Sequence, residues 1–347
     1  MQPSKFTGYG LLLLFLSGLF ACSAPEPIRL QGSTMGTSYS VVIPKLGKQQ
    51  NSKTLSKAAI QQGIESLLKQ VNQQMSTYLA DSELSRFNQS AAQTWLSLSP
   101  ELFQTIQAAQ LISEQSAGAF DITVGPLVNL WGFGPDIKPD LKPSAEQLES
   151  AKKRVGYQYL EIELQGRRIR KPFKNLYIDL SAIAKGYAVD VVASYLDSLH
   201  IPSYLIEIGG ELKAKGLSQR GDHWRVALEK PLPGQRMVQK VISVTDFAVA
   251  TSGDYRNYFE QDGVRFSHTI DPRTGSSISH ALASVTVLSE QAMLADAWAT
   301  ALMVLGESKG YQLAEEQGLA AYFIYRQGDE FLSRETSAFT RLTEHSG

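Results

Sequence analysis

An aspartate and a threonine stand four residues apart in the otherwise apolar run Met293–Leu302 (MLADAWATAL). Residues four apart share one face of a helix, and a carboxylate on an apolar, buried helix is costly unless it is paired or binds a metal. A carboxylate and a hydroxyl are hard oxygen donors that suit Mg²⁺, because phosphates can supply its remaining ligands. Asp296 and Thr300 are therefore candidate metal ligands, although the two residues alone are explained more simply by an aspartate that pairs or caps locally.

The segment Asp179–Ala188 (DLSAIAKGYA) ends a predicted strand in a carboxylate and opens a helix with small residues. The free N–H groups and the positive dipole end of a helix N-terminus bind phosphate. Lys185 would lie in the first turn, where a positive charge opposes the helix dipole unless an anion is bound there. A surface lysine explains Lys185 equally well, so the segment alone leaves both interpretations open.

Two further segments contain side chains that are unusual for a purely structural role. The run Ala119–Gly134 sets Trp131 and Phe133 among glycines, which suits a flat stacked ligand, although a core turn closed by aromatic side chains fits the composition better. The turn Ser267–Gly275 (SHTIDPRTG) contains His268, which ordinary turn composition does not explain. Histidine titrates near neutrality, so His268 is a candidate general base.

Several familiar motifs are absent from the sequence. It contains no GxxxxGK(S/T) P-loop, no GxGxxG fingerprint, no HExxH zinc motif and no GxSxG nucleophile elbow, and its five histidines show no metal-ligand spacing. We therefore expect neither a P-loop nor a Rossmann fold.

The elements that must position these residues are helices and strands in mixed order. Apolar periodicity and caps predict helices over 55–75, 100–116, 144–154, 182–199 and 289–305, the last ended by Gly306. We expect strands over 36–43, 159–164, 176–180, 204–208, 212–216, 224–229, 238–244 and 283–288, a hairpin turn at Asp262-Gly263, and a last helix and hairpin. Blocks of strands without strict βα alternation predict an α+β fold with a largely antiparallel sheet.

The composition excludes several classes of protein. The 347 residues include 33 Lys and Arg and 34 Asp and Glu, a net charge of −1, which argues against a nucleic-acid partner. Hydrophobic residues make up 43% of the chain, enough for a sizeable core. The single cysteine excludes an internal disulfide and a Cys-rich zinc site.

That cysteine follows the apolar run Leu11–Phe20, which is too short to span a bilayer and is typical of a signal peptide. The segment Leu19-Phe20-Ala21-Cys22 resembles a bacterial lipobox, in which the signal is removed before a lipidated cysteine, and Ser23 favours sorting to the outer membrane. We therefore expect a signal peptide (1–21), a tether (22–30) and a mature domain (31–347), lipid-anchored through Cys22 in the bacterial cell envelope and facing the periplasm. An ordinary secretory signal with a chance cysteine is the alternative.

Taken together, these segments resemble the ApbE-type FAD:protein FMN transferases. The similarity runs from about Met35 to Gly306 and includes MGT, MSTY, DSELSRFN, GAFDITVGPLVNLWGFG, DLSAIAKGYAVD, EIGGE, SGDYRNYF, SHTIDPRTG and MLADAWATALMVLG, in that order. Any one of these runs is a weak signal, but their number and order are specific. The resemblance implies an α+β, T-fold-like ApbE architecture.

It also implies an activity. Enzymes of this kind bind FAD and Mg²⁺, cleave the pyrophosphate, move FMN onto a threonine hydroxyl of a target protein and release AMP. Their known targets are flavin-carrying subunits of Nqr and Rnf redox complexes. By this resemblance, FAD would contact Met35, Tyr78, Ala119, Phe120, Asp121, Asp179, Lys185 and Ile270. The metal would be held by Asp296, Thr300 and the backbone carbonyl of Ala182; His268, as base, and Asp296 are the candidate catalytic residues.

Two alternatives stay open. An FAD pyrophosphatase would use the same site with water in place of threonine, and the motifs cannot separate the two reactions. A non-catalytic flavin-binding lipoprotein would be favoured by loss of Asp296 or Thr300, and both residues are present.

Overall fold

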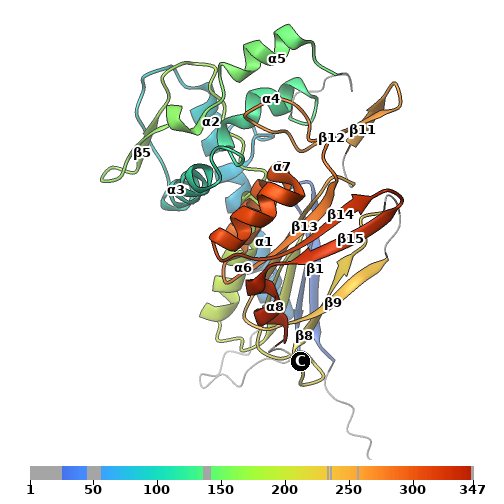
Figure 1. Cartoon of the computed structure of the whole chain (residues 1–347). Helices are drawn as coiled ribbons and strands as arrows, with labels where there is room; N and C mark the ends of the chain where they lie inside the picture. The colour runs from blue at the N-terminus through green and yellow to red at the C-terminus, as the bar shows by residue number, and fades with distance from the viewer. Residues whose placement is uncertain are drawn as a thin grey trace, which may run out of the picture.

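An eight-stranded sheet forms the body of the molecule (Figure 1). The computed structural model describes residues 26–44, 56–135, 142–232, 234, 237–255 and 258–344. The strands lie in the order β1 (Ile28–Thr34), β2 (Thr37–Ile43), β6 (Tyr204–Ile208), β7 (Glu211–Lys215), β10 (Ala248–Gly253), β13 (Leu282–Ser289), β14 (Ala320–Gln327) and β15 (Glu330–Glu335). Each described neighbour pair in this sheet is antiparallel, as the sequence predicts.

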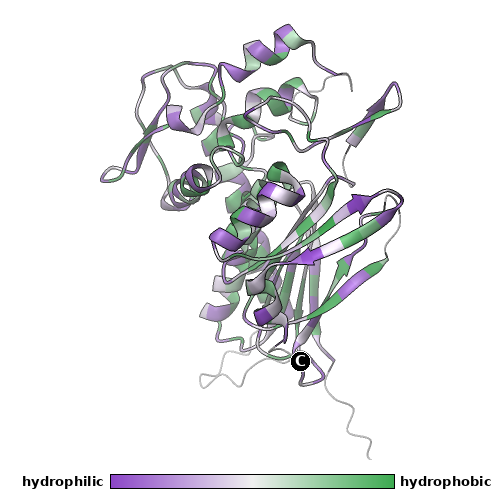
Figure 2. Cartoon of the chain, viewed as in Figure 1, coloured by the Kyte–Doolittle hydropathy of each residue, from purple (hydrophilic) through white to green (hydrophobic). Residues whose placement is uncertain are grey.

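The two faces of the sheet are covered differently. Helices α1 (Lys57–Met75), α6 (Ala184–Ser198) and α7 (Ala292–Glu316) bury their apolar sides against one face and form the main core with it. The ribbon β8 (Trp224–Glu229) and β9 (Val238–Val244) and the helix α8 (Ser337–Glu344) cover the other face around a second core. Figure 2 shows the strands behind α7 as mostly hydrophobic, which is expected for a sheet covered on both faces.

A smaller group of elements lies at one end of the sheet (Figure 1). It contains α2 (Glu83–Gln89), α3 (Pro100–Gln115), α4 (Gly125–Leu130), α5 (Ala145–Lys152), the sheet β3 (Leu96–Ser97), β5 (Arg168–Arg170) and β4 (Glu161–Glu163), and the hairpin β11 (Tyr258–Gln261) and β12 (Val264–Ser267). A third apolar cluster ties α4 and α5 to that hairpin through Leu127, Trp131, Ala151, Phe259 and Ile270. The mixture of helices and antiparallel strands confirms the predicted α+β class.

Local sequence signals explain where the helices begin. Ser56 caps α1, Ser99 caps α3 with Pro100 in the first turn, and Ser144 forms a capping box with Gln147 at α5. These boundaries agree with the predicted helices to within a few residues.

The predicted strand 176–180 is wrong, and the reason is a single side chain. These residues form no strand and pair with no strand in the described part of the chain. The Asn88 amide donates to the Ile178 carbonyl at 2.9 Å and accepts from the Ile178 N–H at 2.8 Å. Because Asn88 satisfies the backbone as a neighbouring strand would, the segment needs no strand partner.

Two other boundaries differ from expectation. Helix α7 has a break at Gly306 (φ 80°, ψ 179°), where the predicted helix ends, but helical structure resumes directly and runs to Glu316. Strand β1 begins at Ile28, so the last residues of the predicted tether 22–30 are part of the sheet, where Leu30 is buried.

The predicted signal peptide (1–21) and Cys22 lie outside the described residues. Within the described ranges, no helix combines the length and the apolar character needed to cross a bilayer.

Candidate active site

One cavity of about 490 Å³ brings together all the site residues predicted from the sequence except Cys22. It is lined by Met35, Tyr78, Ala119, Phe120, Asp121, Asp179, Ala182, Lys185, His268, Ile270, Asp296 and Thr300. A larger hollow, of about 620 Å³, lies between α1, α3 and α6 and is lined by other residues. The cavity of about 490 Å³ is the candidate active site, because it brings together residues more than 260 positions apart in the sequence.

Asp296 lies at the floor of this cavity, on α7. The residue is 4% exposed, and its Oδ2 accepts a hydrogen bond from the Gly186 N–H at 3.0 Å. Burial raises the pKa of the Asp296 carboxyl, while the ammonium of Lys185, 3.9 Å from Oδ1, and the Gly186 N–H favour its ionised form. The Asp296 carboxylate therefore has one hydrogen bond and one distant ammonium, and it is shielded from bulk water. This is the environment that the sequence predicts for a metal ligand.

The close crossing of α6 and α7 makes this contact possible. A side chain on Gly186 would place its Cβ 2.3 Å from the Ala292 carbonyl oxygen and 2.8 Å from the Met293 Cα. Only glycine lets the α6 backbone approach α7 closely enough for its N–H to reach Asp296.

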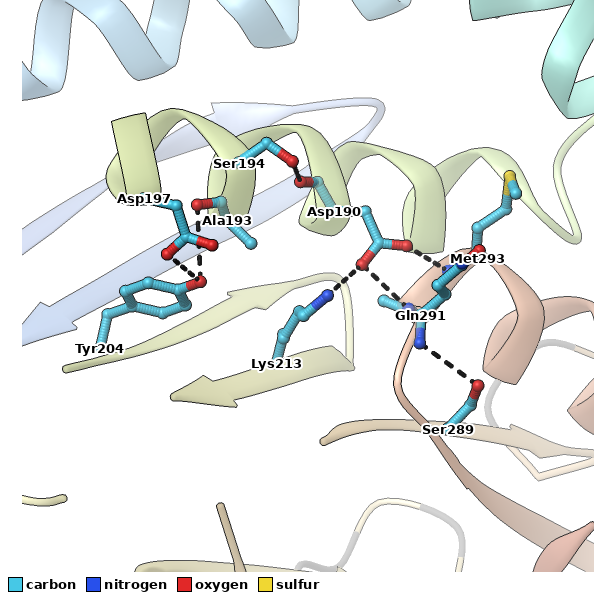
Figure 3. A network of polar contacts seen from close by, with 10 residues as sticks. Asp190, Ala193, Ser194, Asp197, Tyr204, Lys213, Ser289, Gln291 and Met293 are labelled. Carbon is cyan, nitrogen blue, oxygen red and sulfur yellow. Dashed lines mark hydrogen bonds and ion pairs between the residues drawn. The ribbon is translucent and has the colours of Figure 1, made fainter. Parts of the chain in front are cut away.

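Asp190 fixes the same crossing one turn further along α6 (Figure 3). Its carboxylate accepts from the N–H groups of Ala292 (3.1 Å) and Met293 (2.9 Å), which begin α7, and from the Lys213 ammonium (2.8 Å) on β7. A carboxylate at a helix N-terminus is favoured by both the free N–H groups and the dipole. Asp190 lies in a motif identified in the sequence, but nothing in its spacing indicates that it caps a different helix.

A second carboxylate, Glu211, lines the cavity beside Lys185 and has no role predicted from the sequence. It is 4% exposed, and its Oε1 accepts from the Lys185 ammonium at 2.5 Å. Burial raises the pKa of Glu211 to about 7, although Lys185 lowers it and Asp296 raises it further. Its only sequence signal is a charged residue after the pair Gly209-Gly210.

The loops above the floor are held by their own side chains. Asp121 accepts from the Thr123 N–H and hydroxyl (both 2.7 Å) and from the Tyr157 N–H (2.8 Å), so it shapes the loop that carries Ala119 and Phe120. Asp179 accepts from the Ser181 N–H (2.8 Å) and hydroxyl (2.5 Å) just ahead of α6. Both carboxylates set the shape of the cavity wall.

Aromatic residues occupy two different places. Tyr78 is 69% exposed and lies at the rim of the cavity, and Phe133 lines its wall with its ring edge-on to His268, 6.3 Å between centroids. Trp131 does not line the cavity: it is 2% exposed and its Nε1 donates to the Gly275 carbonyl at 2.9 Å. For Trp131, the interpretation as a core turn is therefore the correct one.

The donor set at the floor fits a magnesium ion that also binds a ligand. Asp296 and Thr300 lie with Ala182 around one cavity, and the Thr300 hydroxyl is 3.2 Å from the Ser252 hydroxyl. Over the described ranges, no group of three or more His, Cys, Asp or Glu side chains forms a closed metal cage. Few protein oxygens, all hard, suit Mg²⁺, which keeps several water or phosphate ligands.

Comparison with known proteins agrees with this geometry. The model of the ApbE family matches residues 35–323. The chain is 47% identical over 328 residues to the FAD:protein FMN transferase of Vibrio cholerae (94% of this chain, 95% of that one) and 44% identical over 331 residues to that of Haemophilus influenzae (94% of each).

Solved structures show the same similarity. The flavin transferase ApbE from Vibrio cholerae superposes with a TM-score of 0.83 at 46% identity, covering 91% of this chain and 99% of that one. The flavinyl transferase ApbE of Pseudomonas stutzeri superposes with a TM-score of 0.82 at 42% identity, covering 92% and 97%. With its family motifs gathered around one cavity, the chain belongs to the ApbE family.

Proposed function

We propose that this protein is an FAD:protein FMN transferase. The observation that carries the proposal is the convergence of all twelve predicted FAD-binding, metal-binding and catalytic residues on one cavity. The names of its relatives, FAD:protein FMN transferase at 47% and 44% identity over nearly the whole chain, support the same activity.

The reaction replaces one phosphate ester bond by another. The acceptor hydroxyl oxygen attacks the phosphorus on the flavin side of the FAD diphosphate. The bond from that phosphorus to the bridging oxygen breaks, and AMP leaves with the electron pair. The acceptor proton must be removed, and His268 on the cavity wall is the residue we assign to accept it. Threonine as the acceptor is part of this proposal.

Different residues of the cavity would bind the flavin ring, the diphosphate and the metal ion. Tyr78 at the rim and Phe133 on the wall offer aromatic faces for the flavin ring. Helix α6 begins at Ala184, and the Ala184 and Gly186 N–H groups already donate to the Leu180 carbonyl and to Asp296, so the helix would favour a nearby phosphate through the positive end of its dipole. Asp296, Thr300 and the Ala182 carbonyl would hold Mg²⁺, which when bound neutralises charge on the diphosphate. Lys185 adds a positive charge at the same end of the cavity.

The acceptor and the location are further parts of the proposal. Flavin-carrying subunits of Nqr- or Rnf-type redox complexes are membrane proteins, and an enzyme anchored through a lipid on Cys22 and facing the periplasm would lie beside them. The apolar run that ends directly before the single cysteine supports the anchor.

Mass spectrometry of an acceptor domain after reaction with FAD and Mg²⁺ tests the activity. We expect FMN on an acceptor threonine with the wild-type protein, and loss of transfer with Asp296→Ala, because one of two side-chain metal ligands is removed. The matched control Asp329→Ala changes an exposed aspartate in the turn between β14 and β15 and should transfer normally.

The other outcomes distinguish the alternatives. Free FMN and AMP with an unmodified acceptor would indicate an FAD pyrophosphatase, and bound, unchanged FAD in the presence of Mg²⁺ would indicate a non-catalytic flavin-binding protein. Full transfer by a folded Asp296→Ala variant would refute the metal assignment.

A further inference from the structure

A buried carboxylate oxygen in the candidate active site has no partner. Glu211 is 4% exposed and lines the cavity, and its Oε1 accepts from Lys185. Its Oε2 is buried and finds no hydrogen-bond donor within the described chain. Buried acceptors of this kind are rare in native proteins, because each costs the full desolvation of the group. Such an atom, on a residue that lines a cavity, calls for a water or an ion as its partner.

The charges of the site point to a cation. The Lys185 ammonium lies 2.5 Å from Glu211 Oε1 and 3.9 Å from Asp296 Oδ1, so two buried carboxylates share one positive charge. When both are ionised, one negative charge stays uncompensated in a poorly hydrated cavity. A divalent cation near Asp296 would supply the missing positive charge.

The backbone holds Glu211 in this position. Glu211 begins β7 directly after Gly209-Gly210, and the turn is fixed by Glu207, whose Oε1 accepts from the Gly210 N–H at 2.7 Å. Gly209 has a φ of +61°, and a Cβ there would lie 3.2 Å from Lys185 Cδ. The stem of Lys185 therefore passes close against the turn, between Glu211 and α7.

We propose that Glu211 is a further ligand of the divalent cation, through Oε2. In the metal-free protein, the Lys185 ammonium lies between Glu211 and Asp296 and partly neutralises both carboxylates until the metal binds. The inference depends on the proposed function only in placing a divalent cation at Asp296 and Thr300. Once displaced from the two carboxylates, the Lys185 ammonium is still inside the cavity, where it can meet the diphosphate of FAD.

Binding of Mn²⁺ to the FAD-free, full-length protein tests this inference without turnover. Calorimetry or electron paramagnetic resonance is run at about pH 8, above the pKa of Glu211, so that the carboxylate is ionised. Glu211→Gln should weaken Mn²⁺ binding roughly tenfold to a hundredfold, the loss typical of a ligand or its close support. Lys185→Met should strengthen binding, because the competing ammonium is gone. The matched control Glu207→Gln keeps its amide oxygen as an acceptor and should bind Mn²⁺ like the wild type.

Each outcome decides the matter. Wild-type Mn²⁺ affinity in a folded Glu211→Gln variant would overturn the inference, and so would a Lys185→Met variant that binds no more tightly. If Glu211→Gln does not fold, the double variant Lys185→Met/Glu211→Gln decides, because it leaves no unpaired ammonium and should bind Mn²⁺ more weakly than Lys185→Met only if Glu211 is a ligand.

Asp296→Ala separates this inference from the proposed function. If the wild type binds Mn²⁺, Asp296→Ala does not, and Glu211→Gln binds normally, only the role of Glu211 is refuted. If the wild type itself binds no Mn²⁺, both the metal part of the proposed function and this inference fail.

Discussion

Lys171 is a fully buried cation held by backbone carbonyls alone in the part of the chain described. Its ammonium donates to the carbonyl oxygens of Asn88 (2.6 Å), Lys174 (2.9 Å) and Leu176 (3.3 Å), and it lies 5.4 Å from the centre of the Phe87 ring. Burial, with a smaller contribution from Lys174, lowers the pKa of Lys171 to about 8. Lys171 thus links the end of α2 to residues 174–176, which lead into Asp179 of the candidate active site.

This gives a prediction about stability and pH. In the unfolded chain Lys171 keeps its proton up to about pH 10.4, whereas the folded protein releases it near pH 8. Between these values the unfolded state binds more protons, so the Lys171 contribution to the free energy of unfolding rises with pH. We expect the stability difference between wild type and Lys171→Met, from urea unfolding, to be larger at about pH 9.5 than at about pH 7.

The control is Lys69→Met, which removes an exposed lysine from α1. Its stability difference from the wild type should be small and nearly the same at both pH values. An equal difference at both pH values for Lys171→Met would contradict the prediction.

At the scale of single residues, the sequence predicts the site residues that lie in its motifs, but not the residues that become important only through contacts made by the fold. The twelve cavity residues follow from motifs, but Glu211 acquires its importance only because β7 brings it beside Lys185. The partners of Lys171 are backbone carbonyls, which leave no trace in the sequence. A sequence alone cannot predict which backbone carbonyls a side chain will meet, or which residues will lie beside it in the folded sheet.

At the scale of elements, the position of α7 decides where the proposed cation ligands Asp296 and Thr300 lie. Asp190 holds the first turn of α7 through two N–H groups (Figure 3). Asp296 follows one turn later on the same helix. A shift of this helix by a fraction of an ångström would alter the distances between Asp296, Thr300 and the residues of α6. Asp190 is therefore a positioning residue for the site.

Asp190→Asn should lower the free energy of unfolding by about 1–3 kcal/mol, because an amide cannot accept from both N–H groups and from Lys213 as a carboxylate does. Chemical denaturation measures the loss, and Mn²⁺ titration should show weaker binding.

The matched control is Asp197→Asn, seven residues further along α6. Asp197 accepts from Tyr204 (3.0 Å, Figure 3) and from Lys215 (2.8 Å). Its side chain is 43% exposed, against 20% for Asp190, and within the described residues none of its hydrogen bonds reaches α7. Its substitution should cost less stability and leave Mn²⁺ binding unchanged. Equal effects of the two substitutions on Mn²⁺ binding would remove the positioning role from Asp190.

The same scale shows why the prediction of elements succeeds in most places and fails in a few. Periodicity and capping identify α1, α3 and α5 because these signals are local. The segment 176–180 has the alternation of a strand, yet the Asn88 side chain, 90 residues away in sequence, takes the place of its partner. A glycine at 306 interrupts α7 without ending it, because residues beyond it pack against the sheet again.

At the scale of the whole molecule, the cavity lies between separate hydrophobic cores. Met35, Ala182 and Lys185 belong to elements of the main core, whereas Ile270 belongs to the cluster that holds α4, α5 and the hairpin β11–β12. A ligand that fills the cavity would contact both groups of residues. We expect it to stabilise the molecule as one unit.

Calorimetry with FAD and a chelator, which prevents turnover, tests this expectation. At a concentration of about 100 times its dissociation constant, FAD should raise the free energy of unfolding by about 2.7 kcal/mol. Unfolding should become or stay a single transition. AMP alone is the control and should stabilise less, since it cannot reach the flavin side of the cavity. A shift confined to one of two transitions would contradict coupling through the ligand.

The overall class could be predicted because it depends on the order of strands and helices along the chain. The strand order of the sheet could not, because β1–β2 pairs with β6 and β7 with β10, neighbours that local patterns do not specify. Sequence motifs therefore indicate which residues form the site, whereas the arrangement of its walls depends on the fold.

The span of the cavity along the chain has a consequence for biogenesis. Its walls begin at Met35, in the turn between β1 and β2, and end at Val304 on α7, so nearly the whole folded chain must be in place before the pocket exists. Contacts this distant in sequence form late, because closing long loops is entropically costly. A partly synthesised or partly folded chain therefore lacks the complete binding site. Binding of a flavin nucleotide would therefore indicate that the molecule has finished folding.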